Sequence, residues 1–142
     1  MSTISRQLQL PYSTTQMYAL VNDVASYPQF VPWCTQATIY SADHTHMRAR
    51  LQVEWQGVQQ GFTTENKLVE NQSISMNLIE GPIKNLQGDW RFVPTSSGSH
   101  VELTLSFTFN NRLLSLLFAK VVDKILNRLV DAFCQRAKVL YG

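Results

Sequence analysis

The residues that could do acid–base or metal chemistry are few, and the sequence does not gather them. The three histidines are His44 and His46, in or beside a turn, and His100, at the start of a strand. A catalytic site needs titratable groups collected on an inner face, so this placement predicts no catalytic residue and no metal site. The sequence also has no nucleophile elbow, phosphate-binding loop or zinc-ligand spacing. The pattern favours a binding protein that requires no cofactor over an enzyme.

Two cysteines and one apolar segment are the other features of the sequence that could serve a site. Cys34 and Cys134 fit neither a metal-ligand spacing nor a C-x-x-C motif, so both are predicted to be buried, reduced thiols. Residues 27–34 read YPQFVPWC, and the two prolines exclude a long helix or a central strand. This octapeptide is predicted to be a loop or a single helical turn. Its large apolar side chains either cover the core or close one end of a ligand cavity.

The elements that would position these residues follow from the hydrophobic periodicity. Apolar and polar residues alternate almost throughout residues 35–110, with short turn-rich breaks. This alternation is typical of antiparallel strands with one solvated face. In the first strand Arg6 shares the apolar side, which indicates that part of this strand reaches an edge. Seven strands are predicted, at residues 4–10, 35–41, 45–55, 58–69, 73–80, 86–94 and 100–109.

Two helices are predicted around these strands. Ser13 and Gln16 have the spacing of a capping box, and apolar residues at helical intervals follow as far as Val24. A long helix over residues 113–140 closes the chain, and one of its sides is a wide apolar stripe. The opposite side carries three cations at four-residue intervals, called here the basic row: Lys120, Lys124 and Arg128.

These elements predict an α+β fold in a single domain over residues 1–142, with a seven-stranded curved antiparallel sheet wrapped around the long C-terminal helix. A helix about 10 Å wide cannot cover the whole concave face, so bulky side chains or a ligand must fill the rest. Strand 58–69 brings polar Thr64 and Asn66 to its apolar side. It is therefore either an edge strand of mixed exposure or the polar end of a cavity. The candidate ligand-binding residues are Tyr27, Phe30, Val31, Trp33, Trp55, Phe62, Thr64, Asn66, Met76, Trp90, Phe92, Phe107, Phe118, Val122, Ile125, Leu129 and Phe133.

The charge of the chain is small but unevenly placed. The formal net charge is +2, which is too weak to indicate nucleic acid by itself, and no DNA partner is predicted. Residues 111–142, however, hold six basic and two acidic side chains. The basic row is either a solvated helix face or a contact for RNA or an anionic lipid surface. Neither a signal peptide nor an apolar run of spanning length is present, so we expect a cytoplasmic protein, at most resting against the inner face of the membrane.

Four stretches in this order carry a family resemblance. They are YPQFVPWC at 27–34, GPIKNLQGDWRF at 81–92, FTFNNRLLSLLF at 107–118 and VDAFCQRAKVLYG at 130–142. Together with the order of the elements, they resemble the START-like helix-grip family, of polyketide cyclase/dehydrase type. Within it, they resemble the coenzyme-Q-binding proteins and the bacterial ribosome-association toxins.

This resemblance implies alternative functions. One is non-enzymatic binding of ubiquinone or a related isoprenoid lipid between the sheet and the C-terminal helix, in support of respiration. The other is that of a toxin that binds the large ribosomal subunit and blocks subunit joining. The fold also includes polyketide cyclases, but the sequence offers no inward acids and bases for that chemistry. An apolar cavity suits a quinone, whose surface is mostly apolar with a small polar head.

Overall fold

The computed structural model describes residues 2–142, apart from the side chains at positions 114, 115, 117 and 118. Seven antiparallel strands form one sheet of order β1-β7-β6-β5-β4-β3-β2, which confirms the predicted fold class. The prediction for Phe118 falls outside the described side chains. The strands are β1 (Ser2–Leu10), β2 (Cys34–Ala42), β3 (His46–Trp55), β4 (Val58–Val69), β5 (Ser73–Glu80), β6 (Asn85–Thr95) and β7 (Gly98–Thr108).

The helices begin and end close to the predicted positions. Helix α1 (Thr14–Asn22) starts at a capping box, in which the Gln16 backbone N donates to Ser13 Oγ at 3.1 Å and the Ser13 backbone N donates to Gln16 Oε1 at 3.0 Å. This confirms the predicted helix start. The remaining helices are the 3-10 turn η1 (Val24–Ser26), the single turn α2 (Tyr27–Phe30) and the long α3 (Arg112–Tyr141).

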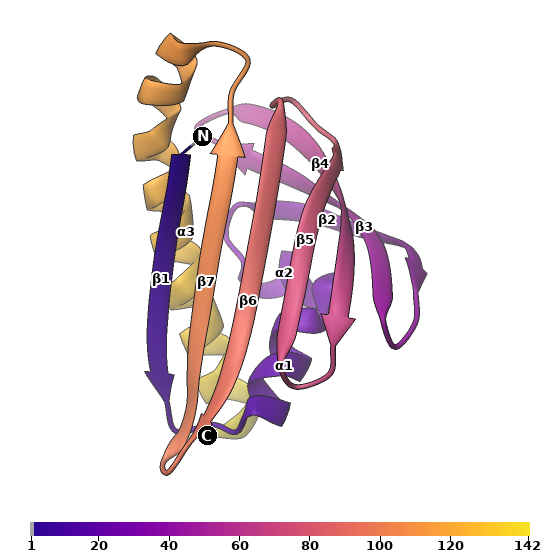
Figure 1. Cartoon of the computed structure of the whole chain (residues 1–142), viewed down its shortest axis with the longest axis vertical. Coiled ribbons are helices and arrows are strands. Elements are labelled where there is room, and N and C mark those ends of the chain that lie inside the picture. Colours follow the sequence, from indigo (N-terminus) through magenta and orange to yellow (C-terminus); the bar gives the residue numbers. More distant parts are fainter. Residues whose placement is uncertain (1) are drawn as a thin grey trace.

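The sheet curves around α3, as Figure 1 shows. Helix α3 runs along the open side of the sheet next to β1, from its first turns at the top of the view to the C-terminus at the bottom. Helix α1 lies at the lower end, and α2 lies within the curve. The edge strand β1 therefore lies beside α3, whereas α2 contacts both the other edge strand, β2, and α3.

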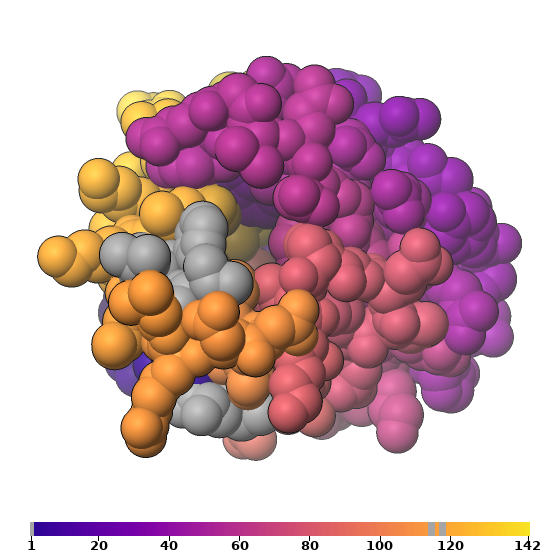
Figure 2. Space-filling model, turned by 90° about the horizontal axis from the view of Figure 1, so that it is seen from above, coloured from indigo at the N-terminus to yellow at the C-terminus, as the bar shows by residue number. Residues whose placement is uncertain are grey.

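The interior is tightly packed at the lower end and less completely packed at the upper one, although Phe107 near the end of β7 is 1% exposed. Where α1 meets the sheet and the second half of α3, side chains are almost fully enclosed, with Val21 2%, Val101 1% and Phe133 1% exposed. Toward the start of α3, apolar side chains on the concave face are only half-buried, among them Leu51, Val53, Phe62, Met76 and Leu105. Viewed from above, the molecule is hollowed at this end, between the first half of α3, the β3–β4 hairpin and the β5–β6 segment (Figure 2). We call this space the hollow.

Candidate ligand-binding site

The octapeptide 27–34 forms a side wall of the interior. Tyr27 is buried, its hydroxyl donates to the main-chain oxygen of Val21, and burial raises the pKa of the phenol. The Tyr27 and Phe30 rings each have their centre 5.5 Å from that of Phe133 on α3. The segment also packs against β2. It therefore fills the gap between β2 and the second half of α3, a side position where the sequence predicted the end of a cavity.

Asn66 is a buried polar residue on the concave face. It is 3% exposed, although it lies in a row of inward side chains that is otherwise apolar. The strand register sets this row, which we call the central row: Met47, Asn66, Met76, Gly88, Leu105 and Ile4. Because a buried amide without partners is unfavourable, its hydrogen bonds indicate what the site can do.

A neighbouring hydroxyl makes a hydrogen bond with the Asn66 amide. The Thr64 hydroxyl donates to Asn66 Oδ1 at 2.9 Å. Among the described residues, no partner accepts a hydrogen bond from Asn66 Nδ2, so the NH₂ group remains an unused donor. Asn66 thus offers a donor without a protein acceptor on a mostly apolar face. It suits a ligand that presents a carbonyl or another acceptor oxygen.

Gly88 is a site residue that the sequence reasoning missed. It occupies the middle of the central row, and a Cβ placed there would lie 2.4 Å from Cε of Met76 and 3.3 Å from Cδ1 of Leu105. The Met76 side chain therefore leans over Gly88, and the sheet contributes no bulk of its own at this point. An isolated glycine inside a strand is a signal for close approach of another group and could have indicated this position.

The structure divides the predicted lining residues into two sets. Half-buried members are Trp55, Phe62, Thr64, Met76, Val122 and Ile125, together with Phe30, which packs against Phe133 in the second half of α3. Asn66 joins them as the buried polar group. Members enclosed in packed regions are Tyr27, Val31, Trp33, Trp90, Phe92, Phe107, Leu129 and Phe133. The second set holds the walls in place, whereas the first set has surface available for a ligand.

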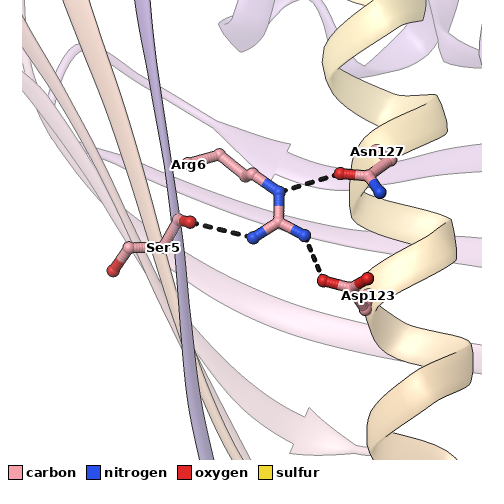
Figure 3. A network of polar contacts seen from close by, with 4 residues as sticks. All are labelled: Ser5, Arg6, Asp123 and Asn127. Carbon is pink, nitrogen blue, oxygen red and sulfur yellow. Dashed lines mark hydrogen bonds and ion pairs between the residues drawn. The ribbon is translucent and has the colours of Figure 1, made fainter.

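Two contacts hold α3 between the edges of the curved sheet. On the β1 side, Arg6 Nε donates to Asn127 Oδ1 at 2.9 Å and its Nη2 pairs with Asp123, while Nη1 donates to the Ser5 carbonyl (Figure 3). The inward arginine of the first strand, which does lie at the sheet edge, thus pairs with a helix acid. On the β3 side, the Arg128 guanidinium carbon lies 5.0 Å from the centre of the Trp55 ring. Both contacts position α3 over the concave face.

The basic row is exposed, but its members differ in their surroundings. Arg128 lies over an aromatic ring and has a structural contact. Lys120 and Lys124 are exposed and have no ion-pair partner within the described part of the chain. These two lysines are therefore the cations available to a partner.

The thiols differ in access. Cys34 is 3% exposed, as predicted, whereas Cys134 is only half-buried, and burial raises the pKa of both. A raised pKa lowers the thiolate fraction at neutral pH, and thiolate is the reactive form. We expect iodoacetamide to label Cys134 slowly and Cys34 more slowly still in the folded protein, and both rapidly in denaturant. Mass spectrometry of the labelled peptides measures this, and fast native labelling of Cys34 would contradict its placement.

Two negative findings hold for the described residues. No group of three or more His, Cys, Asp or Glu side chains within them could hold a metal ion. None of the helices among them is long and apolar enough to cross a bilayer.

The curved seven-stranded sheet and the long C-terminal helix form a START-like helix-grip fold. The family model described as polyketide cyclase / dehydrase and lipid transport matches residues 10–134, and the chain belongs to this family. The predicted resemblance is thereby confirmed.

Relatives within the family have different names. The chain is 46% identical to the ribosome association toxin RatA of Escherichia coli, over 100% of this chain and 90% of that protein. It is 33% identical to the mitochondrial coenzyme Q-binding protein COQ10 homolog B of Xenopus laevis, over 94% of this chain and 57% of that protein.

Solved structures extend the likeness of fold. A START superfamily protein of Mycobacterium smegmatis superposes with a TM-score of 0.85 at 21% identity, covering 97% of this chain and 98% of the other. An aromatase/cyclase from Streptomyces superposes with a TM-score of 0.88 at 16% identity, covering 96% and 93%. The fold is therefore shared by enzymes and binding proteins, and the fold alone does not decide between them.

Proposed function

We propose that the protein binds a lipophilic molecule of the ubiquinone type in the hollow, without catalysis, and that this binding supports respiration. The observation that carries the proposal is Asn66, which is 3% exposed on a mostly apolar concave face and whose NH₂ group has no acceptor among the described residues. The inward side chains of β3–β7 are apolar or neutral, which favours binding over acid–base chemistry. The name of the Xenopus laevis relative supports the choice of ligand class.

The ligand has two parts with different needs. A quinone head carries carbonyl oxygens, and one of them accepts the hydrogen bond that Asn66 Nδ2 leaves unused. The isoprenoid tail lies against half-buried apolar side chains such as Leu105 and Ile125. Binding then pairs the buried donor and encloses apolar surface in one step. Thr64 contributes by holding the amide in the orientation that presents its NH₂ group.

Removing the polar pair should separate stability from binding. In the double variant Thr64→Val, Asn66→Leu, both hydrogen-bonding partners become apolar groups of similar shape, a change that is often neutral or stabilising. We expect the free energy of unfolding of the empty protein to be unchanged or up to about 2 kcal/mol higher. Affinity for decylubiquinone, measured by quenching of tryptophan fluorescence, should fall roughly tenfold, the effect of removing one hydrogen bond to a buried group.

Asn77→Leu is the matched control. Asn77 is exposed on the convex side of β5 and accepts from Gln87 Nε2 at 3.1 Å. The same chemical change there should leave quinone affinity as it is. Equal affinity of the double variant and the unsubstituted protein would refute the role of Asn66. Absence of quenching in all three, with no quinone in protein purified from a respiring host, would refute the proposed ligand.

A second candidate function is association with the large ribosomal subunit, as the toxin branch of the resemblance implies. The observation that favours it is the exposed lysines Lys120 and Lys124 on α3, which have no ion-pair partner among the described residues and suit RNA phosphates. The name of the Escherichia coli relative supports it. Co-sedimentation of the purified protein with separated ribosomal subunits tests it directly.

A further inference from the structure

The first two turns of α3 expose two leucines. Leu113 is 66% exposed and Leu116 is 71% exposed. Their spacing of three residues puts them on one side of the helix. Single exposed leucines are ordinary on protein surfaces. Here two neighbours stand together at the end of the molecule where the hollow opens, as Figures 1 and 2 show for the start of α3. We call Leu113 and Leu116 the leucine tip.

Cations surround the leucine tip. Lys120 and Lys124 continue the same side of α3 at four-residue steps, and Arg112 begins the helix. The β5–β6 loop adds Lys84, whose backbone N donates to the Thr108 carbonyl at 3.1 Å and so lies next to the end of β7. All four cations are exposed.

We propose that this end of the molecule docks on an anionic phospholipid bilayer, with the leucine tip inserted and Lys84, Lys120 and Lys124 against lipid phosphates. Lys120 and Lys124 lie about 6 Å and 12 Å along the helix axis from Leu116, at 1.5 Å per residue. Interfacial apolar groups enter a bilayer by about 5–10 Å. With α3 held steeply to the membrane, inserted leucines therefore place Lys120 at headgroup level.

Docking in this orientation would let a lipophilic ligand pass directly between the bilayer and the hollow. The hollow opens at the same end of the molecule as the leucine tip, so it would face the bilayer in which a lipophilic ligand dissolves. The identity of the cargo rests on the proposed function. The docking itself does not, because it requires only the tip and the cations.

The other end of α3 supplies a matched control. Val139 is 75% exposed and Leu140 is 49% exposed, so an equally apolar pair stands beside the packed end of the molecule. Two double variants make comparable changes at opposite ends of α3. One combines Leu113→Ser with Leu116→Ser, and the other combines Val139→Ser with Leu140→Ser. Each would be floated with vesicles of phosphatidylcholine alone and of phosphatidylcholine mixed with phosphatidylglycerol.

We expect the unsubstituted protein and the Val139, Leu140 variant to float with the anionic vesicles and much less with neutral ones. The Leu113, Leu116 variant should bind anionic vesicles at least tenfold more weakly, since two apolar side chains no longer insert. Replacing Lys120 and Lys124 by glutamine should weaken binding about fivefold for each lysine. Added salt should weaken the attraction between the remaining cations and the lipid phosphates.

Several outcomes would overturn the proposal. The first is that the unsubstituted protein does not float with anionic vesicles. The second is that both serine double variants lose vesicle binding equally. The third is that the protein binds ribosomal subunits but no vesicles. Titration with decylubiquinone in vesicle-free buffer keeps the two proposals apart. A protein that docks on vesicles but does not bind the quinone retains the docking surface and loses the proposed ligand. The leucine variant should keep its quinone affinity and receive quinone from vesicles more slowly.

Discussion

Replacing Phe133 by alanine should lower the free energy of unfolding by about 3–5 kcal/mol, the loss typical of deleting a buried aromatic ring. Phe133 is 1% exposed, and its ring centre lies 5.5 Å from those of Tyr27 and Phe30 and 5.4 Å from that of Trp90. The ring joins α3 to the octapeptide and to β6. The substitution would leave a cavity where the ring stood. Because the neighbouring rings belong to separate elements, they cannot all move inward to fill it. Chemical denaturation followed by circular dichroism measures the change.

Two controls define this result. Phe133→Leu keeps most of the apolar volume and should cost clearly less than the alanine variant. Val139→Ala removes methyl groups from a side chain that is 75% exposed on the same helix, so the free energy of unfolding should hardly change. If Phe133→Ala were no worse than Val139→Ala, the aromatic cluster would not be the packed end of the molecule.

Reversing the charge of Lys120 and Lys124 should strongly weaken any association with the large ribosomal subunit. If each lysine neutralises one RNA phosphate, its removal costs on the order of tenfold in affinity at low salt, and reversal costs more. The slope of log affinity against log salt should also fall by about one for each phosphate that is no longer neutralised. Arg128 is left unchanged because it lies over the Trp55 ring, 5.0 Å from its centre, and its removal would disturb the fold. Co-sedimentation across a salt series measures both effects.

The double variant that combines Lys67→Glu with Lys138→Glu is the control, because it changes the net charge by the same amount. Both lysines are exposed, on β4 and in the last turn of α3. This variant should associate with the subunit nearly as well as the unsubstituted protein does. Equal weakening in the two double variants would show that net charge, and not the surface of α3, governs the association. An unchanged melting temperature in both would confirm that folding is intact.

The proposed functions depend on different residues and can therefore be separated. The proposed quinone binding uses Asn66 and Thr64 on the concave face, whereas the proposed ribosome association uses exposed Lys120 and Lys124. The leucine tip distinguishes a membrane from a ribosome, because inserted leucines contribute to bilayer binding and are not needed for contact with phosphates. A protein can have more than one of these activities, since each uses its own surface.

The sequence was sufficient for the elements of the fold. An antiparallel sheet with one solvated face requires strict alternation, so the strands could be read from the polar and apolar residues. The capping box at Ser13 and Gln16 could also be predicted from the sequence, because it depends on side chains only three residues apart. The polar intrusion at Thr64 and Asn66 was visible for the same reason: the period of two assigns each residue to a face.

Only the tertiary structure decided which inward residues are packed and which are left with free surface. Periodicity predicts that Phe133 and Ile125 both face inward, but Phe133 is enclosed by other rings while Ile125 is half-buried. The difference depends on where α1 and α2 pack along α3, which involves contacts between residues distant in the chain. The pairing of Arg6 with Asp123 and Asn127 across more than a hundred residues was hidden for the same reason. Local patterns determine which face a side chain takes, whereas its neighbours across that face are determined by how the sheet curves around the helix.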